Sequence, residues 1–230
     1  MNEIGGVIFD LDGTLADTIP LICAAWNASV PMYTHRTYTD AEVIARFGIP
    51  DAAMIRREIP GRSAEHAIQV YHEYYQQHHD RVKIFDGIQA MLTELARREV
   101  ALGLMTGKSR HTADITLRAL GWGDIFASVV TGDEVEHQKP HAEGPLKVAR
   151  ALRVEASHCA FVGDSPADIG AGRNAKMLTI AAAWASLYVD ELRQLQPDAW
   201  AGHPREVVSL VTAALHQGRP YASRSNGLSI

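Results

Sequence analysis

The stretch GVIFDLDGTLADT, residues 6–18, contains the pattern that decides the fold. An apolar run, Val7–Phe9, ends in two aspartates, Asp10 and Asp12, with one leucine between them. Side chains of an extended backbone alternate between its two faces, so both carboxylates are expected to point the same way. Two carboxylates at close range repel each other unless a cation lies between them or one takes a proton. The stretch therefore predicts a buried strand that ends in a charged site.

The composition limits the class of protein. The 230 residues are 47% hydrophobic with a formal net charge of -5, which is enough for one substantial core, with or without a smaller satellite domain. The chain lacks the basic face of a nucleic-acid-binding protein, the long apolar run of a membrane span and the basic start of a signal peptide. Cys23 and Cys159 match no metal spacing and indicate free thiols in a reducing compartment. We expect a cytoplasmic protein that binds neither nucleic acid nor membrane; its oligomeric state stays open.

Short apolar runs bounded by turn residues recur along the chain, and each has the length of a strand. They lack strict alternation, which is typical of strands that are covered on both faces. The runs are Val7–Phe9, Ala101–Met105, Ser128–Val130, Ala160–Val162 and Leu178–Ala181. Helical patterns separate the later runs. This alternation predicts an α/β fold, a Rossmann-like parallel sheet with helices on both faces.

The expected helices show apolar periodicity or capping residues. One has the i, i+3, i+4, i+7 spacing of a buried helix face, with Ile88, Met91, Leu92 and Leu95. Others are expected over residues 109–120 and 145–152. A further helix begins at Ser165, which can cap it, with Pro166 in the first helical position. The last begins at Pro204 and would bury Val207, Val211, Ala214 and Leu215.

Residues 16–85 break the alternation, because they hold several helical segments and no convincing strand. Thr39 and Glu42 fit a capping box, and Gly48 with Pro50 marks a break. We interpret this region as an inserted all-helical cap. The α/β core then comprises residues 1–15 and 86–218, and residues 219–230 form a flexible tail.

Side chains that can do chemistry follow the predicted strands. They are Asp10 and Asp12 after the first strand, Thr106 after the second, Lys139 after the third, and Asp164 and Asp168 after the fourth. In an open parallel sheet, ligands bind beyond the carboxyl ends of the strands, so these groups are expected at one edge. Oxygen ligands without His or Cys favour magnesium. A hydroxyl and a lysine facing the same point suggest a phosphoryl group.

These residues resemble the four motifs of the haloacid dehalogenase-like (HAD) superfamily, in the order of that family. The matching segments are Asp10-Leu11-Asp12-Gly13-Thr14-Leu15, Thr106, Lys139-Pro140 and Gly163-Asp164-Ser165-Pro166-Ala167-Asp168. The resemblance extends to about residue 216 and is nearest to the phosphoglycolate phosphatase-like and sugar-phosphate phosphatase branches. Asp10 and Asp12 alone could equally be turn residues, but four segments at four strand ends favour the functional interpretation.

The resemblance implies a role for each residue. Asp10 would be the nucleophile that forms an aspartyl-phosphate, and Asp12 the general acid and base, with the like charge nearby keeping it able to hold a proton. Magnesium would be held by Asp10, the backbone carbonyl of Asp12 and Asp164, with Asp168 acting directly or through water. Thr106 and Lys139 would contact the phosphoryl oxygens, and Lys139 would also hold the Asp10 carboxylate.

Substrate recognition is less defined. We hypothesise that Arg46 contacts an anionic group of the substrate; the alternative is a helix-end arginine favoured by the helix dipole. Gly107, beside the phosphoryl site, stands where many of the resembling enzymes have Asn. Ala142 replaces a usual second proline, and Lys176 stands where a helix-ending glycine is frequent.

The sequence thus predicts a magnesium-dependent phosphatase acting on a small phosphorylated metabolite. The alternatives are a phosphomutase of the beta-phosphoglucomutase kind and a non-catalytic binding protein on the same fold. A haloacid dehalogenase would need neither Asp12 nor a metal, and a phosphonoacetaldehyde hydrolase would need a cap lysine, whereas residues 1–100 contain only Lys83.

Two local patterns are excluded as binding motifs. Thr106-Gly107-Lys108-Ser109 is not a phosphate-binding P-loop, because Leu102 occupies the place of its first glycine, so Lys108 is expected to be solvated or near the substrate. Pro140 stands between His137 and His141 and excludes a zinc pair on a helix.

Overall fold

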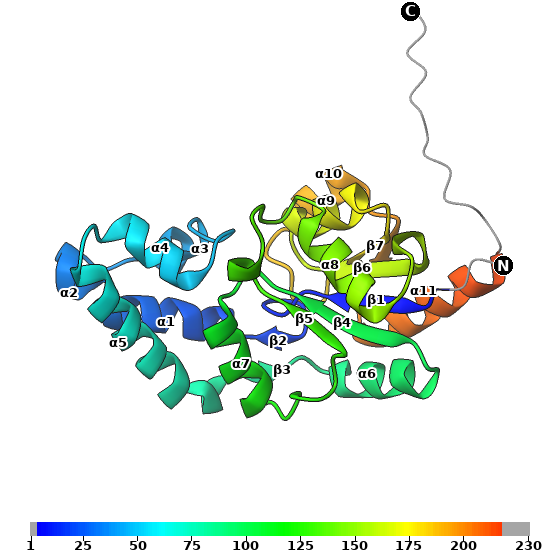
Figure 1. The fold of residues 1–230 in the computed structure, drawn as a ribbon, viewed down its shortest axis with the longest axis horizontal. Coiled ribbons are helices and arrows are strands. Elements are labelled where there is room, and N and C mark those ends of the chain that lie inside the picture. The colour runs from blue at the N-terminus through cyan, green and yellow to red at the C-terminus, as the bar shows by residue number, and fades with distance from the viewer. Residues whose placement is uncertain (1–3, 218–230) are drawn as a thin grey trace, which may run out of the picture.

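The computed structural model describes residues 4–217, with a six-stranded parallel sheet at the centre (Figure 1). The strand order is β5-β4-β1-β6-β7-β8. The strands are β1 (Gly6–Phe9), β4 (Ala101–Met105), β5 (Ser128–Val130), β6 (Cys159–Gly163), β7 (Leu178–Ala182) and β8 (Ala199–Ala201). Strand β1 lies inside the sheet, where Gly6 pairs with Ala101 of β4 and with Cys159 of β6. The expected parallel α/β fold is confirmed, and the strand that precedes Asp10 is among its central ones.

Helices cover both faces of the sheet. They are α6 (Ile88–Arg97), α7 (Arg110–Ala119), α8 (Glu143–Leu152), α9 (Pro166–Asn174), α10 (Val189–Leu195) and α11 (Pro204–Gln217). Val7 and Phe9 of β1 join a hydrophobic cluster with α6 and α11, whereas Ile8 joins another cluster with α8. Successive side chains of a strand point to opposite faces, so this division explains why the strands lack an apolar and polar alternation.

The helix patterns read from the sequence agree with the packing. The four periodic residues of α6 are all buried, as are Val207 and Val211 of α11. Ala214 and Leu215 lie outside the side chains that the structure describes, as does the expected tail, residues 219–230.

Residues 16–85 contain a helical segment with its own hydrophobic cluster. Its helices are α1 (Ile19–Ser29), α2 (Pro31–Thr34), α3 (Asp40–Ile44), α4 (Asp51–Glu58) and α5 (Ser63–Gln77). The fully buried side chains of Trp26, Tyr71 and Tyr75 belong to this cluster. The capping box of Thr39 and Glu42 is present at the start of α3. In Figure 1 these helices lie beside the sheet rather than against either face of it.

Four elements differ from the sequence interpretation. Strands β2 (Ala16–Asp17) and β3 (Lys83–Ile84) pair antiparallel where the chain leaves and re-enters the core, so the expectation of no strand in residues 16–85 is wrong. Two residues are too short to show any periodicity. Strand β8 and helix α10 were not predicted, because three and seven residues likewise give little pattern. Within residues 4–217, every helix is too short or too polar to cross a bilayer.

Candidate active site

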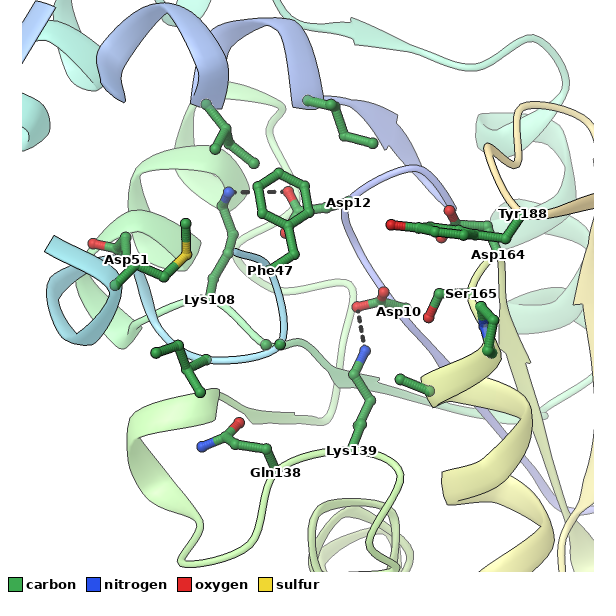
Figure 2. A pocket seen from close by; sticks show the side chains of 18 of the residues that line it. Asp10, Asp12, Phe47, Asp51, Lys108, Gln138, Lys139, Asp164, Ser165 and Tyr188 are labelled. Atoms are coloured by element: carbon green, nitrogen blue, oxygen red, sulfur yellow. Dashed lines mark ion pairs between the residues drawn. The ribbon is translucent and has the colours of Figure 1, made fainter. Parts of the chain in front are cut away.

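Three carboxylates meet at the carboxyl edge of the sheet. Asp10 follows β1, Asp164 follows β6, and Asp168 lies in the first turn of α9. All three are buried, and one carboxylate oxygen of each lies within 4.8 Å of the others. Figure 2 shows Asp10 and Asp164 at one cavity. This gathering was expected because each residue follows a predicted parallel strand.

One ammonium group lies among these carboxylates. The Nζ atom of Lys139 is 3.0 Å from Asp10 Oδ1 and 2.6 Å from Asp168 Oδ1. It is also 3.5 Å from the carbonyl oxygen of Met105, at the end of β4. Lys139 therefore joins the loop after β5 to the ends of β1 and β4 and to α9, and it holds the Asp10 carboxylate as expected (Figure 2).

Helix capping orients Asp168. Its Oδ2 accepts hydrogen bonds from the backbone N–H and the hydroxyl of Ser165, at 3.0 and 2.6 Å. Ser165 Oγ in turn accepts the Asp168 N–H, which completes a capping box, and Pro166 occupies the first turn. Because the cap uses Oδ2, Oδ1 is directed to Lys139.

Asp164 is held by the turn that follows β1. The hydroxyl of Thr14 donates to Asp164 Oδ1 at 2.7 Å. Gly13 has φ +78°, and a Cβ there would lie 2.5 Å from Asp164 Oδ2, so only glycine allows this turn to pass so close. Thr14 lies within the first motif, Asp10–Leu15, and the motif by itself indicated no separate role for its hydroxyl.

The charges in this cluster are unbalanced. Burial and the neighbouring charge of Asp168 raise the pKa of Asp10 to about 7, although Lys139 opposes the shift. Burial, with the charges of Asp168 and Asp10, also raises the pKa of Asp164 well above its usual range. Burial alone would lower the pKa of Lys139, but Asp10 and Asp168 raise it, so the lysine stays charged. One ammonium group cannot neutralise three carboxylates.

This donor set fits a hard divalent cation. Its ligands are carboxylate oxygens, buried and close together, with neither His nor Cys among them. A cation at this point would supply the charge that the cluster lacks. The raised pKa values of Asp10 and Asp164 are the sign of that deficit.

Asp12 faces the same cavity but has different partners. Its Oδ1 accepts a short hydrogen bond from the Thr18 hydroxyl and lies 3.0 Å from Lys108 Nζ. Burial and the neighbouring carboxylates raise the pKa of Asp10, whereas Asp12 is paired with the Lys108 ammonium group. Lys108 is only 7% exposed, so the interpretation of a solvated lysine is wrong, and its position at the cavity is that of the substrate-side alternative. Burial disfavours its charge, but Asp12 and Tyr75 raise its pKa.

The other predicted site residues differ in their positions. Thr106 is fully buried after β4, and its hydroxyl accepts the Lys108 N–H at 3.2 Å. Gly107 lines the cavity, and a Cβ there would meet no atom within 4 Å.

Arg46 lies outside the cavity lining and is used within the helical segment. Its Nε is 3.0 Å from Glu58 Oε2, and its guanidinium lies over the rings of Tyr38 and Trp26. These contacts account for Arg46 without any substrate.

The cavity has a volume of about 320 Å³ and lies between the sheet edge and the helical segment. The helical segment contributes a mostly apolar wall, formed by Ile19, Ile22, Phe47, Ile49, Met54 and Tyr71. Tyr71 packs in the helical segment and lines the cavity as well. Apolar side chains gave no signal that separates a cavity wall from a core.

Asp51 links the helical segment to the core, and no sequence motif indicated it. Its Oδ1 accepts hydrogen bonds from the Ser109 N–H at 3.1 Å and the Thr112 hydroxyl at 3.0 Å, at the start of α7. Its Oδ2 lies 2.7 Å from His72 Nε2. Burial alone would raise the pKa of Asp51, but the hydrogen bonds from His72 and Ser109 lower it below its usual range.

A second group of metal-type side chains lies on the surface. His137, His141 and Glu143 have ligand atoms within 4.8 Å of one another, although residues 137–141 form no helix. Both carboxylate oxygens of Glu143 already accept backbone N–H groups, from Glu136 and His137, and Lys147 also binds. The polar contacts of Glu143 are therefore those of a structural turn and need no metal ion.

Comparison with known proteins decides the family. The family model described as haloacid dehalogenase-like hydrolase matches residues 7–182. The chain belongs to the haloacid dehalogenase-like hydrolases. The resemblance to this superfamily that was read from the motifs is thus confirmed, and the family makes the chain a hydrolase.

Individual relatives cover nearly the whole of this hydrolase. The pyrophosphatase PpaX of Oceanobacillus iheyensis is 30% identical over 210 residues, 91% of this chain and 97% of the relative. A protein described as a predicted phosphoglycolate phosphatase from Haemophilus somnus superposes with a TM-score of 0.82 at 18% identity, over 91% of this chain and 98% of that one. CbbY of Rhodobacter sphaeroides, in complex with phosphate, gives a TM-score of 0.78 at 20% identity, over 89% and 96%. At these identities the two structures show the shared fold.

Proposed function

We propose that this hydrolase releases phosphate from small-metabolite phosphate monoesters, with magnesium and through an aspartyl-phosphate on Asp10. The observation that carries the proposal is the Lys139 ammonium group between Asp10 and Asp168, with Asp164 beside them in the lining of a cavity. This arrangement offers a carboxylate nucleophile next to a site for positive charge, which is what in-line attack on a phosphoryl group requires.

Two carboxyl groups have different roles: Asp10 bonds to phosphorus, and Asp12 transfers protons. An oxygen of Asp10 attacks phosphorus, and the bond to the leaving oxygen breaks as Asp12 gives that oxygen a proton. Asp12 then takes a proton from water, which attacks the aspartyl-phosphate and frees phosphate and Asp10. Support comes from the position of both side chains on one cavity, directly after β1.

The remaining core residues hold charge. Magnesium would be held by Asp10, the backbone carbonyl of Asp12 and Asp164, with Asp168 acting directly or through water. When bound, it supplies the positive charge that offsets the phosphoryl oxygens. Lys139, paired with Asp10 and Asp168, adds a second positive charge. Thr106 would contact a phosphoryl oxygen, and Gly107 would lie beside it.

We further propose that residues 16–85 act as a cap over a core formed by residues 1–15 and 86–218. The support is the cavity, whose walls come from both parts, and the separate hydrophobic cluster of the helical segment. A cap of this kind excludes water from the reaction and contacts the leaving group. Arg46 has no part in this proposal, because its contacts lie inside the segment.

Phosphate release from a panel of substrates tests the proposal. The panel contains phosphoglycolate, pyrophosphate, sugar phosphates and nucleotides, each with magnesium and with a chelator. The expected result is magnesium-dependent release that Asp10→Asn abolishes, while Asp190→Asn, the same change at an 86% exposed side chain, retains it. Turnover by Asp10→Asn would overturn the mechanism. Release only in the presence of a sugar bisphosphate would favour a phosphomutase.

A further inference from the structure

A buried lysine stands behind Asp12 without a part in the chemistry described above. The Lys108 side chain is 6% exposed, and its Nζ lies 3.0 Å from Asp12 Oδ1. Figure 2 shows Lys108 and Lys139 reaching two different aspartates, Asp12 and Asp10, from different sides. An ammonium group is costly to bury and persists only with compensating partners, so the position of Lys108 has to be explained by what it contacts.

Lys108 and a hydroxyl share one oxygen of Asp12. Oδ1 receives both the Lys108 ammonium group and the Thr18 hydroxyl. Among residues 4–217, no hydrogen-bond donor occupies Oδ2, and the Asp12 side chain retains 18% exposure at the cavity. One oxygen of the carboxyl group is therefore anchored and the other is available to a bound molecule.

Lys108 is itself fixed by the helical segment. Its Nζ lies 4.7 Å from the centroid of the Tyr75 ring, within the range of a cation–π contact. Tyr75, at the end of α5, is fully buried, stacks on Tyr71 and shares a hydrogen bond of 3.0 Å with Thr116 of α7. The contacts thus run without a gap from α5 through Lys108 to Asp12.

We propose that Lys108 is a positioning residue for Asp12: it anchors Oδ1, so that Oδ2 is presented to the leaving oxygen of the substrate. This inference rests on the proposed role of Asp12 in proton transfer. The Tyr75 ring keeps the ammonium group in place, so the helical segment contributes to the geometry of proton transfer as well as to the cavity wall.

Two esters of matched shape separate positioning from other roles. The leaving group of 4-nitrophenyl phosphate departs as a stable phenolate, whereas that of 4-nitrobenzyl phosphate must be protonated as it departs. General acid catalysis contributes about 10²–10⁴-fold. Lys108→Met is therefore expected to lower kcat/KM for the benzyl ester at least about tenfold more than for the phenyl ester. Lys108→Arg, which keeps a cation, is expected to restore part of that ratio.

A matched pair of variants at Tyr75 tests whether its ring holds the Lys108 ammonium group in place. Tyr75→Phe keeps the ring and removes the hydroxyl, whereas Tyr75→Leu removes the ring. Only the leucine variant is expected to shift the ratio between the two esters toward that of Lys108→Met. Since both measurements are ratios within one variant, a general loss of folded protein cancels.

Three outcomes overturn the inference. Equal losses of kcat/KM for both esters would show that Lys108 has a structural role. No loss for either ester would show that Lys108 has no role in the reaction. A loss confined to KM for phosphoglycolate, whose leaving group carries an anion, would make Lys108 a substrate ligand. If the wild type hydrolyses neither ester nor any other monoester, the proposed function fails first, which separates that failure from the failure of the role of Lys108.

Discussion

The cavity is bordered by a cluster of three buried carboxylates, which lines it through Asp10 and Asp164, and by the single buried carboxylate of Asp51. The protein compensates their charges in opposite ways. Asp10, Asp164 and Asp168 share a single ammonium group, and the pKa of Asp10 is raised to about 7 by burial and by Asp168. Asp51 is just as deeply buried but has hydrogen bonds from three neighbours, and its pKa lies below its usual range despite burial.

The difference shows that burial alone does not decide the charge of a carboxyl group. Hydrogen-bond donors and neighbouring charges decide it together with burial. Asp51 has enough donors to be a stable anion that links α4 to α7. The cluster at the sheet edge has too few, so the folded chain holds unfavourable electrostatic energy that a cation can relieve. The first arrangement is structural, and the second is suited to binding and chemistry.

Removal of metal should reveal the largest difference between the carboxylate cluster and Asp51. We expect a chelator to lower phosphatase activity by at least about 10³-fold, since a bound cation contributes several kcal/mol of charge stabilisation. The variant Asp51→Asn should keep the same magnesium dependence, because Asp51 is not part of the cluster. Phosphate release across a magnesium titration measures both. Equal activity of the wild type with and without chelator would contradict the account.

The same substitution at the two aspartates should change stability in different directions. In metal-free buffer, Asp51→Asn should lower the free energy of unfolding by about 1–3 kcal/mol, since it disturbs a satisfied buried anion. Asp10→Asn should leave it unchanged or raise it, because it removes repulsion within the cluster. Urea unfolding of both variants beside the wild type gives the comparison. If Asp10→Asn proved the more destabilising change, the cluster would not be strained.

The pH dependence of stability should follow from the cluster. With a pKa of about 7 in the folded state and 3.8 as its ordinary value, Asp10 holds a proton in the folded chain between these limits and loses it in the unfolded chain. Its contribution to the free energy of unfolding therefore falls as pH rises through this window, by at most about 1.4 kcal/mol per pH unit for one proton.

Other carboxyl groups give the controls for this pH effect. Asp164, whose pKa is also raised, acts in the same direction as Asp10. Asp51 acts in the opposite one, because its pKa is lowered and its stabilisation is lost only in more acid solution. Unfolding at several pH values with chelator should show a shallower slope for Asp10→Asn. An unchanged slope would mean that Asp10 is ionised throughout.

A change remote from both regions should have the smallest effect. Lys176, just after α9, has φ +60°, a left-handed conformation that suits glycine. Lys176→Gly should therefore raise the free energy of unfolding by about 0.5–1 kcal/mol, as relief of the strain exceeds the added chain entropy. The gain should add to the effect of Asp51→Asn within error. A loss of stability would show that the lysine side chain stabilises more than its backbone costs.

The edge cluster could be predicted from sequence because parallel strands bring their carboxyl ends to one place. Asp10, Lys139 and Asp164 are far apart in the chain, yet each follows a short apolar run with a turn residue nearby. Strand order within the sheet was not needed for that conclusion. The motifs then agreed with the family to which the chain belongs.

The partners of Asp51 and the contact of Lys108 with Tyr75 could not be predicted, because they depend on how the helical segment packs on the core. Asp51 and Ser109 are 58 residues apart and belong to no common pattern. Arg46 is predicted to contact an anionic group of the substrate, whereas its surroundings are Glu58 and two aromatic rings. Contacts between separately packed parts follow from tertiary structure, to which local periodicity gives no access.

The most direct test of the central claim is the intact mass of the Asp12→Asn variant after incubation with magnesium and 4-nitrophenyl phosphate. That substrate needs no proton on its leaving group, while breakdown of the aspartyl-phosphate needs the base that the variant lacks. The account predicts a gain of one phosphoryl group, located on Asp10 by peptide mapping and absent when Asp10→Asn is added. A phosphoryl group on another residue, or none in a variant that still releases nitrophenol, would contradict it.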